Sequence, residues 1–242
     1  MSIGSSEPRT PAFSGGGLTR ALTVVRRPQA RRMRLSVDPR DGTVRLTLPQ
    51  RAALKPALAW VEGKRGWIEA TLATLPAPHA IVPGGTIPFE GGLLRILWRE
   101  GGSRIVRREA EALVLGGPAE SLAPRVLRWL RREALARLEA ETRAFGLRAG
   151  VSIGRVAVGD PRARWGSCSS AGDIRYSWRL ILAPVAVREA TVAHEVAHRL
   201  HMDHSPAFHA AVAALLGRDP AAERVWLRRH GAALYWIGRQ EA

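Results

Sequence analysis

The feature that most constrains this chain is a pair of histidines four residues apart, with a glutamate directly after the first. The five residues are His194-Glu195-Val196-Ala197-His198. On an α-helix, residues four apart lie on one face, one turn above the other. Small residues beside the histidines, such as Ala193 and Ala197, suit a helix that packs closely against its neighbours. We therefore predict a buried helix with both imidazoles on one face.

This spacing favours metal chemistry. Two imidazoles on adjacent turns of a helix can reach one Zn²⁺ ion at about 2.0–2.1 Å. Such an ion acidifies its bound water, and Glu195 stands where a general base could take that proton and later deliver it to a leaving group. The alternative is an ordinary amphipathic helix with two histidines on its face. The further histidines downstream favour the metal site over this alternative.

The candidates for a third metal ligand are His201, His204, His209, Glu223 and His230. His204 follows His194 by ten residues, which is the metzincin spacing, but His201 stands where metzincins have glycine. On a continuing helix His201 would lie about 10 Å beyond His194 along the axis, too far for three imidazoles to converge readily. Ser205-Pro206 is typical of a helix start, so His204 falls in a returning loop. We predict His204 as the ligand and expect His209 to pack nearby or to contact substrate.

The first half of the chain has the alternation and turn residues of a β-rich region. Residues 44–48 alternate between apolar and polar, and Asp41-Gly42 predicts a hairpin with a strand at 34–37. Apolar residues at helical spacing predict one or two helices between 51 and 75. Further strands are expected at 22–26, 93–98, 103–107 and 112–115.

Gly116-Gly117-Pro118 marks the predicted boundary to a second region. A long helix is expected after it, running to about Phe145 and ended by Gly146. Short strands at 156–158, 174–176 and 178–182, the histidine helix, and helices from about 206 and 220 follow. The predicted fold is α+β, with a disordered tail over 1–20, a β-rich region over 21–118, and a zincin-like domain over 119–242 that carries the HExxH helix.

Charge, cysteine content and hydropathy limit the partners and the cellular location that can be expected for this protein. The formal net charge is +16, but arginine is scattered along the chain, which favours a solvated basic surface over a dedicated nucleic-acid face. The single cysteine, Cys168, excludes an internal disulfide and fits a reducing cytosol. The sequence has neither an apolar run long enough to span a membrane nor the pattern of a signal peptide. We expect a cytoplasmic protein without membrane contact, and the oligomeric state is open.

Four stretches resemble the YgjP-like metal-dependent hydrolases, which are distant relatives of SprT-like and WLM metallopeptidase domains. They are Arg164-Trp165-Gly166-Ser167-Cys168-Ser169, Trp178-Arg179-Leu180, the histidine motif, and Asp203-His204-Ser205-Pro206-Ala207-Phe208. The resemblance covers most of the chain after about Ala21. It implies a zincin-type catalytic domain, zinc as the metal, and a third histidine corresponding to His204. The chain departs from the family at Ser177, where asparagine is usual, and at His209, where tryptophan is usual.

Five residues near these motifs are candidate substrate contacts: Arg164, Trp165, Trp178, Arg179 and His209. For the two tryptophans, core packing is the favoured alternative. For the two arginines, a plain surface position is an equal alternative. Cys168 is interpreted as a packing residue, because no cysteine-protease motif surrounds it.

These features predict a zinc-dependent hydrolase, a metallopeptidase that acts on a peptide or protein with metal-activated water and Glu195 as general base. One alternative is a nucleic-acid-associated protease like the SprT-like relatives, which act on proteins attached to DNA. Another is a non-catalytic zinc-binding module. Three histidine ligands leave a position open for water, which favours a catalytic site. The strands around 174–182 are expected to offer a sheet edge to an extended substrate.

Overall fold

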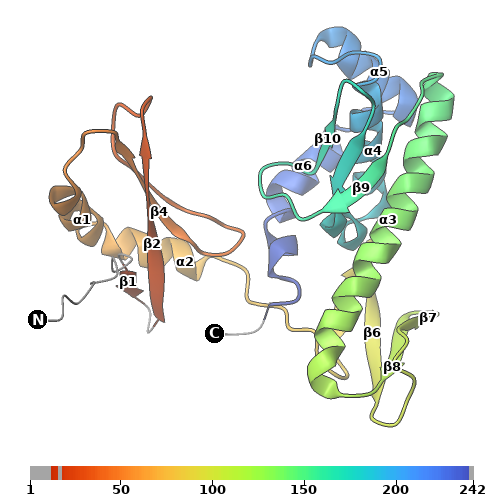
Figure 1. The fold of residues 1–242 in the computed structure, drawn as a ribbon, viewed down its shortest axis with the longest axis horizontal. Helices are drawn as coiled ribbons and strands as arrows, with labels where there is room; N and C mark the ends of the chain where they lie inside the picture. Colours follow the sequence, from red (N-terminus) through yellow and green to blue (C-terminus); the bar gives the residue numbers. More distant parts are fainter. Residues whose placement is uncertain (1–11, 16–17, 240–242) are drawn as a thin grey trace, which may run out of the picture. The chain divides into compact units, whose positions relative to one another are not determined.

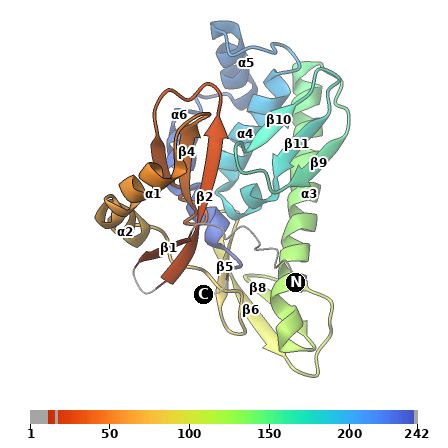
Figure 2. The same ribbon diagram turned by 60° about the vertical axis from the view of Figure 1, so that its left-hand side comes forward.

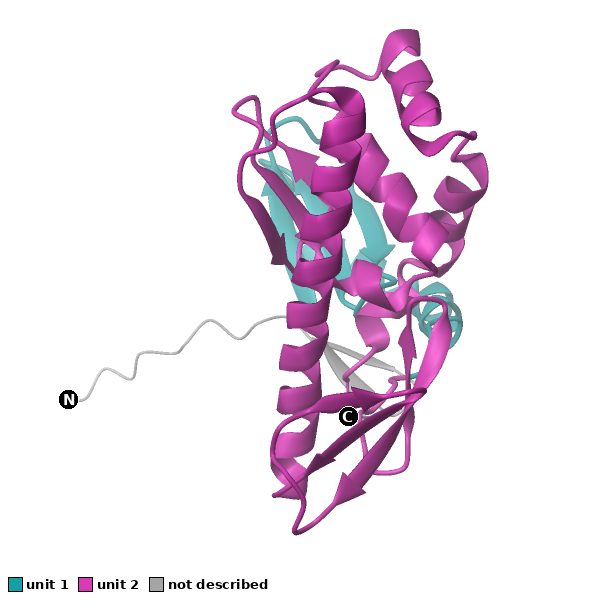
Figure 3. Ribbon diagram, turned by 90° about the vertical axis from the view of Figure 1, so that its right-hand side faces the viewer, with its two compact units in different colours: residues 1–77 teal, residues 78–242 magenta. Residues whose placement is uncertain are grey.

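The computed structural model describes residues 12–15 and 18–239. The chain forms two compact units, Met1–Ala77 and Pro78–Ala242, which Figure 3 shows in different colours. Each unit combines helices with small sheets, so the predicted α+β class is confirmed. Within the described ranges, no helix combines the length and apolar character needed to cross a bilayer.

Unit 1 is a four-stranded sheet followed by two helices (Figure 1). Its elements are β1 (Ala12–Gly15), β2 (Leu18–Arg27), β3 (Arg34–Val37), β4 (Val44–Pro49), α1 (Leu54–Glu62) and α2 (Arg65–Ala73). The strand order is β1-β2-β4-β3, with β2 parallel and β3 antiparallel to β4. The helices predicted between 51 and 75 are therefore confirmed as two.

Alternation along β4 builds the core of unit 1. Its inward side chains, Val44, Leu46 and Leu48, are completely buried and pack with residues of α1 and α2. The hairpin predicted at Asp41-Gly42 is confirmed: Gly42 has φ 72°, and its N–H donates to the carbonyl of Asp38 at 2.8 Å. A positive φ of this kind is readily adopted by glycine alone.

The tail predicted over 1–20 differs from expectation where the structure describes it. Residues 12–15 pair antiparallel with residues 18–21, so β1 and the start of β2 lie inside the expected tail. Such a ladder joins backbone groups, which the composition of the segment does not reveal. The rest of the expected tail lies outside the described residues.

Unit 2 contains two sheets and the histidine motif. The first sheet has the order β5-β6-β8-β7 and the second the order β10-β11-β9. The strands are β5 (Thr86–Phe89), β6 (Gly92–Arg99), β7 (Arg107–Glu109), β8 (Ala112–Gly116), β9 (Val156–Gly159), β10 (Gly166–Cys168) and β11 (Ile174–Ser177). The helices are η1 (Ala119–Ser121), α3 (Leu122–Ala149), η2 (Trp178–Leu182), α4 (Val185–Ala197), α5 (Pro206–Leu216), α6 (Ala221–His230) and η3 (Ala233–Trp236).

The chain divides between Ala77 and Pro78, and not at residue 118, where Gly116-Gly117-Pro118 predicts a boundary. The sheet β5-β6-β8-β7 shares one hydrophobic core with α3, and the rings of Phe89 and Trp129 lie 5.3 Å apart across it. Gly116 ends β8 and Gly117 follows it inside this unit, where its carbonyl accepts a hydrogen bond from the indole of Trp98 at 2.8 Å. Turn residues alone do not distinguish a turn within a unit from a linker between units.

Helix α3 runs the length of unit 2 beside both of its sheets (Figures 1 and 2). It continues past Gly146, the residue expected to end it, and stops at Gly150, which has φ 65°. Gly146 has a packing role instead, because a Cβ atom there would come within 3.1 Å of the Cδ1 atom of Ile153. Close approach of two chain segments, and not helix termination, explains this glycine.

The segment 178–182 forms the 3₁₀ helix η2, although a strand was expected there. The hydroxyl of Ser177 accepts a hydrogen bond from the backbone N–H of Arg179 at 3.3 Å, which caps the turn. All five residues of η2 are buried, so the apolar character of the four residues other than Arg179 reflects burial and not a strand with two different faces.

A buried arginine connects three parts of unit 2. Arg188, on α4, has 2% of its surface exposed. Its guanidinium bonds both carboxylate oxygens of Glu141 on α3, with a shortest distance of 2.6 Å, and lies 3.0 Å from Glu90, the residue after β5. Burial by itself lowers the pKa of Arg188, but the hydrogen bonds and charges of the two glutamates raise it above its ordinary value. The three side chains therefore hold α3, α4 and the β5-β6 turn together.

Replacing Glu141 by alanine should lower the free energy of unfolding by about 3 kcal/mol, because it leaves a buried arginine with one acidic partner fewer. Glu139→Ala is the matched control on the same helix. Glu139 pairs with Arg143 at 2.9 Å on an exposed face, and its loss should cost less than about 1 kcal/mol. Urea unfolding of the full chain measures both variants, and equal losses would contradict the structural role of the buried group.

Candidate metal centre

Helix α4 carries the first two histidines in its last turn. It begins after Pro184 and ends at His198, which is its C-cap residue. Ala193 and Ala197, beside the histidines, are completely buried, and the helix packs against α3 and β10. The small side chains allow this close packing, which fixes the position of the helix end that carries the two imidazoles.

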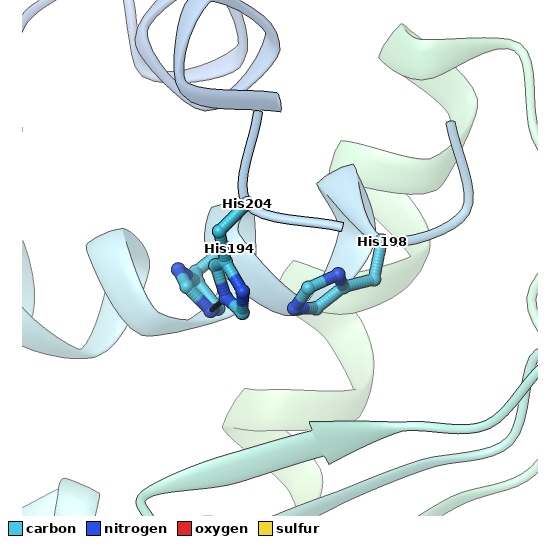
Figure 4. A group of neighbouring side chains, drawn as sticks. All are labelled: His194, His198 and His204. Atoms are coloured by element: carbon cyan, nitrogen blue, oxygen red, sulfur yellow. Dashed lines mark hydrogen bonds between the residues drawn. The ribbon is translucent and has the colours of Figure 1, made fainter. Parts of the chain in front are cut away.

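The third imidazole comes from the segment between α4 and α5. Figure 4 shows the rings of His194, His198 and His204 gathered together. One nitrogen from each lies within 4.8 Å of the others, and the Nε2 atoms of His204 and His194 are 3.3 Å apart. Ser205 caps α5 by accepting the backbone N–H of Phe208 at 3.3 Å, with Pro206 at the first helical position. His204 therefore stands just outside the cap, as the sequence indicated.

Phe208 is a part of the site that the sequence pattern does not predict. Its ring is completely buried and contacts all three imidazoles, with centroid distances of 4.9 Å to His194, 4.5 Å to His198 and 4.8 Å to His204. It lies three residues after the cap of α5, so its position follows from that helix start. Its phenyl ring shields one side of the three-histidine cluster from water.

His201 contributes its backbone to the cluster and not its ring. The Nδ1 atom of His198 lies 3.2 Å from the carbonyl oxygen of His201. Since a carbonyl oxygen can only accept, this nitrogen must carry the proton and donate it. The Nε2 atom of a neutral His198 then keeps its lone pair for another partner.

The cluster favours neutral imidazoles. Burial, together with the charges that His198, His204, His209 and Arg224 would carry, lowers the pKa of His194 to about 4. Burial likewise lowers the pKa of His198. Neutral rings with free lone pairs are the form in which histidine binds a metal ion.

Glu195 is buried beside the cluster, with 4% of its surface exposed. Its side chain lies over Gly166 of β10, where a Cβ atom would come within 2.6 Å of its Cγ atom. Burial raises the pKa of Glu195 to about 7, and the guanidinium of Arg164 opposes part of this rise. The Trp165-Gly166 pair of the sequence motif thus places a glycine where the carboxyl group needs the space.

A cavity of 260 Å³ opens beside His194 and Glu195. Three of the candidate substrate contacts, Arg164, Trp165 and His209, line it. The rest of its wall consists of Gly166, Ala190, Thr191, Val212, Pro220, Glu223, Arg224 and Leu227. The ring of His209 lies 6.4 Å from that of His204, so it faces the cavity and stays outside the three-histidine cluster.

The other two candidate contacts, Trp178 and Arg179, do not line this cavity, which for Trp178 agrees with the core packing that its sequence context favours. Trp178 has 1% of its surface exposed and belongs to the core. Arg179 binds both oxygens of Asp160, at 2.8 and 2.9 Å, and donates to the carbonyl of Leu234 at 2.6 Å. Its guanidinium therefore anchors the segment that leads to Arg164, and has no role at the cavity wall.

Glu223, considered above as a third ligand, also lies outside the histidine cluster. Its Oε1 atom pairs with Arg218 at 2.5 Å, while its Oε2 atom is buried without a hydrogen bond. His230, the most distant candidate, stacks near Trp226 on α6 with the ring centroids 5.0 Å apart. Neither residue joins His194, His198 and His204.

In metal-free protein, Glu195→Gln should stabilise the fold at about pH 8 by on the order of 3 kcal/mol, and the gain should vanish near pH 4.5. The pKa of this carboxyl group rises from 4.5 to about 7 on folding, so the folded chain binds the extra proton and its stability falls as pH rises through that window. Denaturant unfolding with a chelator at several pH values measures this. Glu189→Gln, on α4 but away from the cavity, is the control, and identical pH profiles for all three proteins would contradict the raised pKa.

Comparison with known families agrees with this site. The family model described as YgjP-like, metallopeptidase domain, matches residues 31–230. No curated protein and no solved structure gave a match in the corresponding comparisons. The matched range includes both the histidine helix and the segment that carries His204. The chain therefore belongs to the YgjP-like metallopeptidase family.

Proposed function

We propose that this protein is a zinc-dependent peptidase in which Glu195 is the general base. The observation that carries the proposal is the convergence of three imidazoles, each with a nitrogen within 4.8 Å of the others, next to a buried carboxyl group. Family membership supports the broader class of metal-dependent hydrolases. The catalytic assignment rests on the local arrangement of these four side chains.

The donor set fits zinc. Two nitrogens that bind one tetrahedral Zn²⁺ at about 2.0–2.1 Å lie about 3.3–3.4 Å apart, and the Nε2 atoms of His194 and His204 are 3.3 Å apart. His194, His198 and His204 would hold the ion through ring nitrogens. When bound, zinc supplies Lewis acidity and lowers the pKa of water in the site. Among the described residues, no fourth His, Cys, Asp or Glu joins the three, which favours a catalytic site over a closed structural one.

Glu195 is suited to move a proton in both directions. A pKa of about 7 lets the carboxyl group accept and release a proton near neutral pH. In the proposed reaction a water oxygen bonds to the peptide carbonyl carbon while Glu195 takes a water proton. The C–N bond then breaks, and Glu195 delivers the proton to the leaving nitrogen. The overall change is hydrolysis, with no other reactant.

Strand β10 is the edge on which we place an extended substrate. The edge expected within 174–182 is not available, because β11 is paired on both sides and the following residues form η2. β10 pairs with β11 alone among the described strands, and its Gly166 lies against Glu195. A peptide added to β10 by backbone hydrogen bonds would run past the proposed catalytic residue.

A nucleic-acid-associated peptidase is the second candidate. The net charge is +16, and in unit 1 Trp60, Lys64 and Trp67 line one hollow together with Leu35. Aromatic rings beside cations are what single-stranded nucleic acid uses for stacking and ionic contacts. In this alternative, DNA would increase the peptidase activity.

Glu195→Gln should keep one zinc per chain while lowering the hydrolysis of an unfolded protein by about 10²–10⁴-fold, because only the base is removed. Metal analysis and a protease assay on the same preparations test this, with Glu189→Gln as control. Parallel assays with single-stranded DNA test the second candidate. Loss of zinc from the Glu195 variant would show that this residue is a ligand, and undiminished hydrolysis would show that it is not the base.

His204→Ala should weaken zinc binding by more than about 100-fold, since even the loss of a group that merely supports a ligand costs 10–100-fold. His201→Ala should keep its zinc, because the carbonyl that accepts from His198 belongs to the backbone. His209→Ala should also keep it. Zinc content after dialysis against a competing chelator measures all three variants. Full zinc in the His204 variant, with loss from either of the others, would overturn the ligand assignment.

A further inference from the structure

Two guanidinium groups line the cavity beside the three histidines. Apart from its histidines, its ionisable lining residues are Arg164, Arg224, Glu195 and Glu223. The carboxylate of Glu223 is paired at 2.5 Å with Arg218, which does not line the cavity. The positive charges of Arg164 and Arg224 are therefore not balanced by Glu223.

Arg164 has no hydrogen bond or ion pair with any residue that the structure describes, and its side chain is exposed. The segment that carries it is nevertheless fixed at two points. Arg179 holds Asp160 by two hydrogen bonds, and the hydroxyl of Tyr235 donates to the carbonyl of Pro161 at 2.6 Å. A guanidinium on an anchored segment, without an internal partner, is available to a ligand.

Arg224 reaches the same cavity from α6. Its nearest acid is Asp219, at 3.4 Å, and the two side chains are 50% and 74% exposed. Exposed pairs of this kind contribute little to stability and exchange readily with solvent. A ligand in the cavity can therefore compete with Asp219 for this guanidinium.

The other walls of the cavity are largely apolar, and include Trp165, Val212 and Leu227. Apolar walls exclude water and strengthen charge interactions inside a site. Guanidinium groups bind carboxylates with two parallel hydrogen bonds. The volume, 260 Å³, lies below the range of about 300–1,000 Å³ typical of pockets for drug-sized molecules, so it suits a single residue.

We infer that this cavity is a subsite for a carboxylate of the substrate, bound by Arg164 and Arg224. The carboxylate belongs either to the C-terminus of the peptide or to an acidic side chain. The inference rests on the proposed function, because it assumes that the substrate is a peptide. It adds a preference for negative charge beside the scissile bond.

Binding is measured by calorimetry with the zinc-loaded full chain that carries Glu195→Gln, so that the probes are not cleaved. The first pair of probes is an acetylated alanine tripeptide with a free or an amidated C-terminus. The second pair is an amidated, acetylated tripeptide with central glutamate or glutamine. In at least one pair the acid should bind at least about tenfold more tightly than its neutral counterpart, the effect of a charge-assisted pair. The pair that shows the preference identifies the source of the carboxylate.

Arg164→Gln or Arg224→Gln, added to that protein, should remove most of the preference for the acid over the neutral probe. Arg228→Gln is the matched control, because Arg228 is exposed on α6, one turn after Arg224, and does not line the cavity. Equal affinities for acid and neutral probes in both pairs would overturn the inference. So would a preference that survives both substitutions.

Cleavage of an unfolded protein by the zinc-loaded wild type separates this inference from the proposed function. Cleavage without any carboxylate preference in the binding experiment overturns the subsite alone. Carboxylate binding that depends on Arg164, without cleavage of any peptide or protein, supports the subsite and overturns the peptidase assignment.

Discussion

Helix α4 buries two ionisable side chains in an otherwise apolar interior, and the surrounding structure treats them differently. Arg188 is matched by two glutamates from other elements, which hold α3 and the β5-β6 turn against the helix. Glu195, two turns further on, receives no hydrogen bond from the described residues, and its pKa rises to about 7. An unpaired buried charge is costly, so this carboxyl group keeps its proton up to near neutral pH. Arg188 with its two glutamates stabilises the scaffold, and the unpaired Glu195 lies at the candidate site.

The three-histidine cluster depends on small residues around it. Small residues on α4 let the helix pack closely, and Gly166 leaves room for the Glu195 side chain against β10. Phe208 covers the imidazoles from one side, and the carbonyl of His201 sets the tautomer of His198. Burial and this hydrogen bond together favour neutral rings, so the ligand set is prepared for a metal by its protein surroundings.

The cavity next to the cluster is assembled from parts that are distant in sequence. The segment with Arg164 and Trp165 precedes β10, while Glu223 and Arg224 lie on α6. Arg179 and Tyr235 do not touch the cavity, yet they anchor the segment that reaches it. The position of Arg164 at the cavity wall thus depends on contacts that Arg179 and Tyr235 make outside the cavity.

The sequence by itself determined the local elements: the helix bearing His194 and His198, the capped start of α5 with His204 just before it, and the hairpin at Gly42. Each follows from contacts between residues a few positions apart, which spacing and capping residues express directly. Only the tertiary structure decided that Arg179 binds Asp160, that Phe208 contacts all three imidazoles, that Gly146 is a packing position, and that the sheet of β5 to β8 belongs with α3. Those outcomes depend on contacts between segments far apart in the chain, and a local pattern of residues carries no information about which distant surface it will meet.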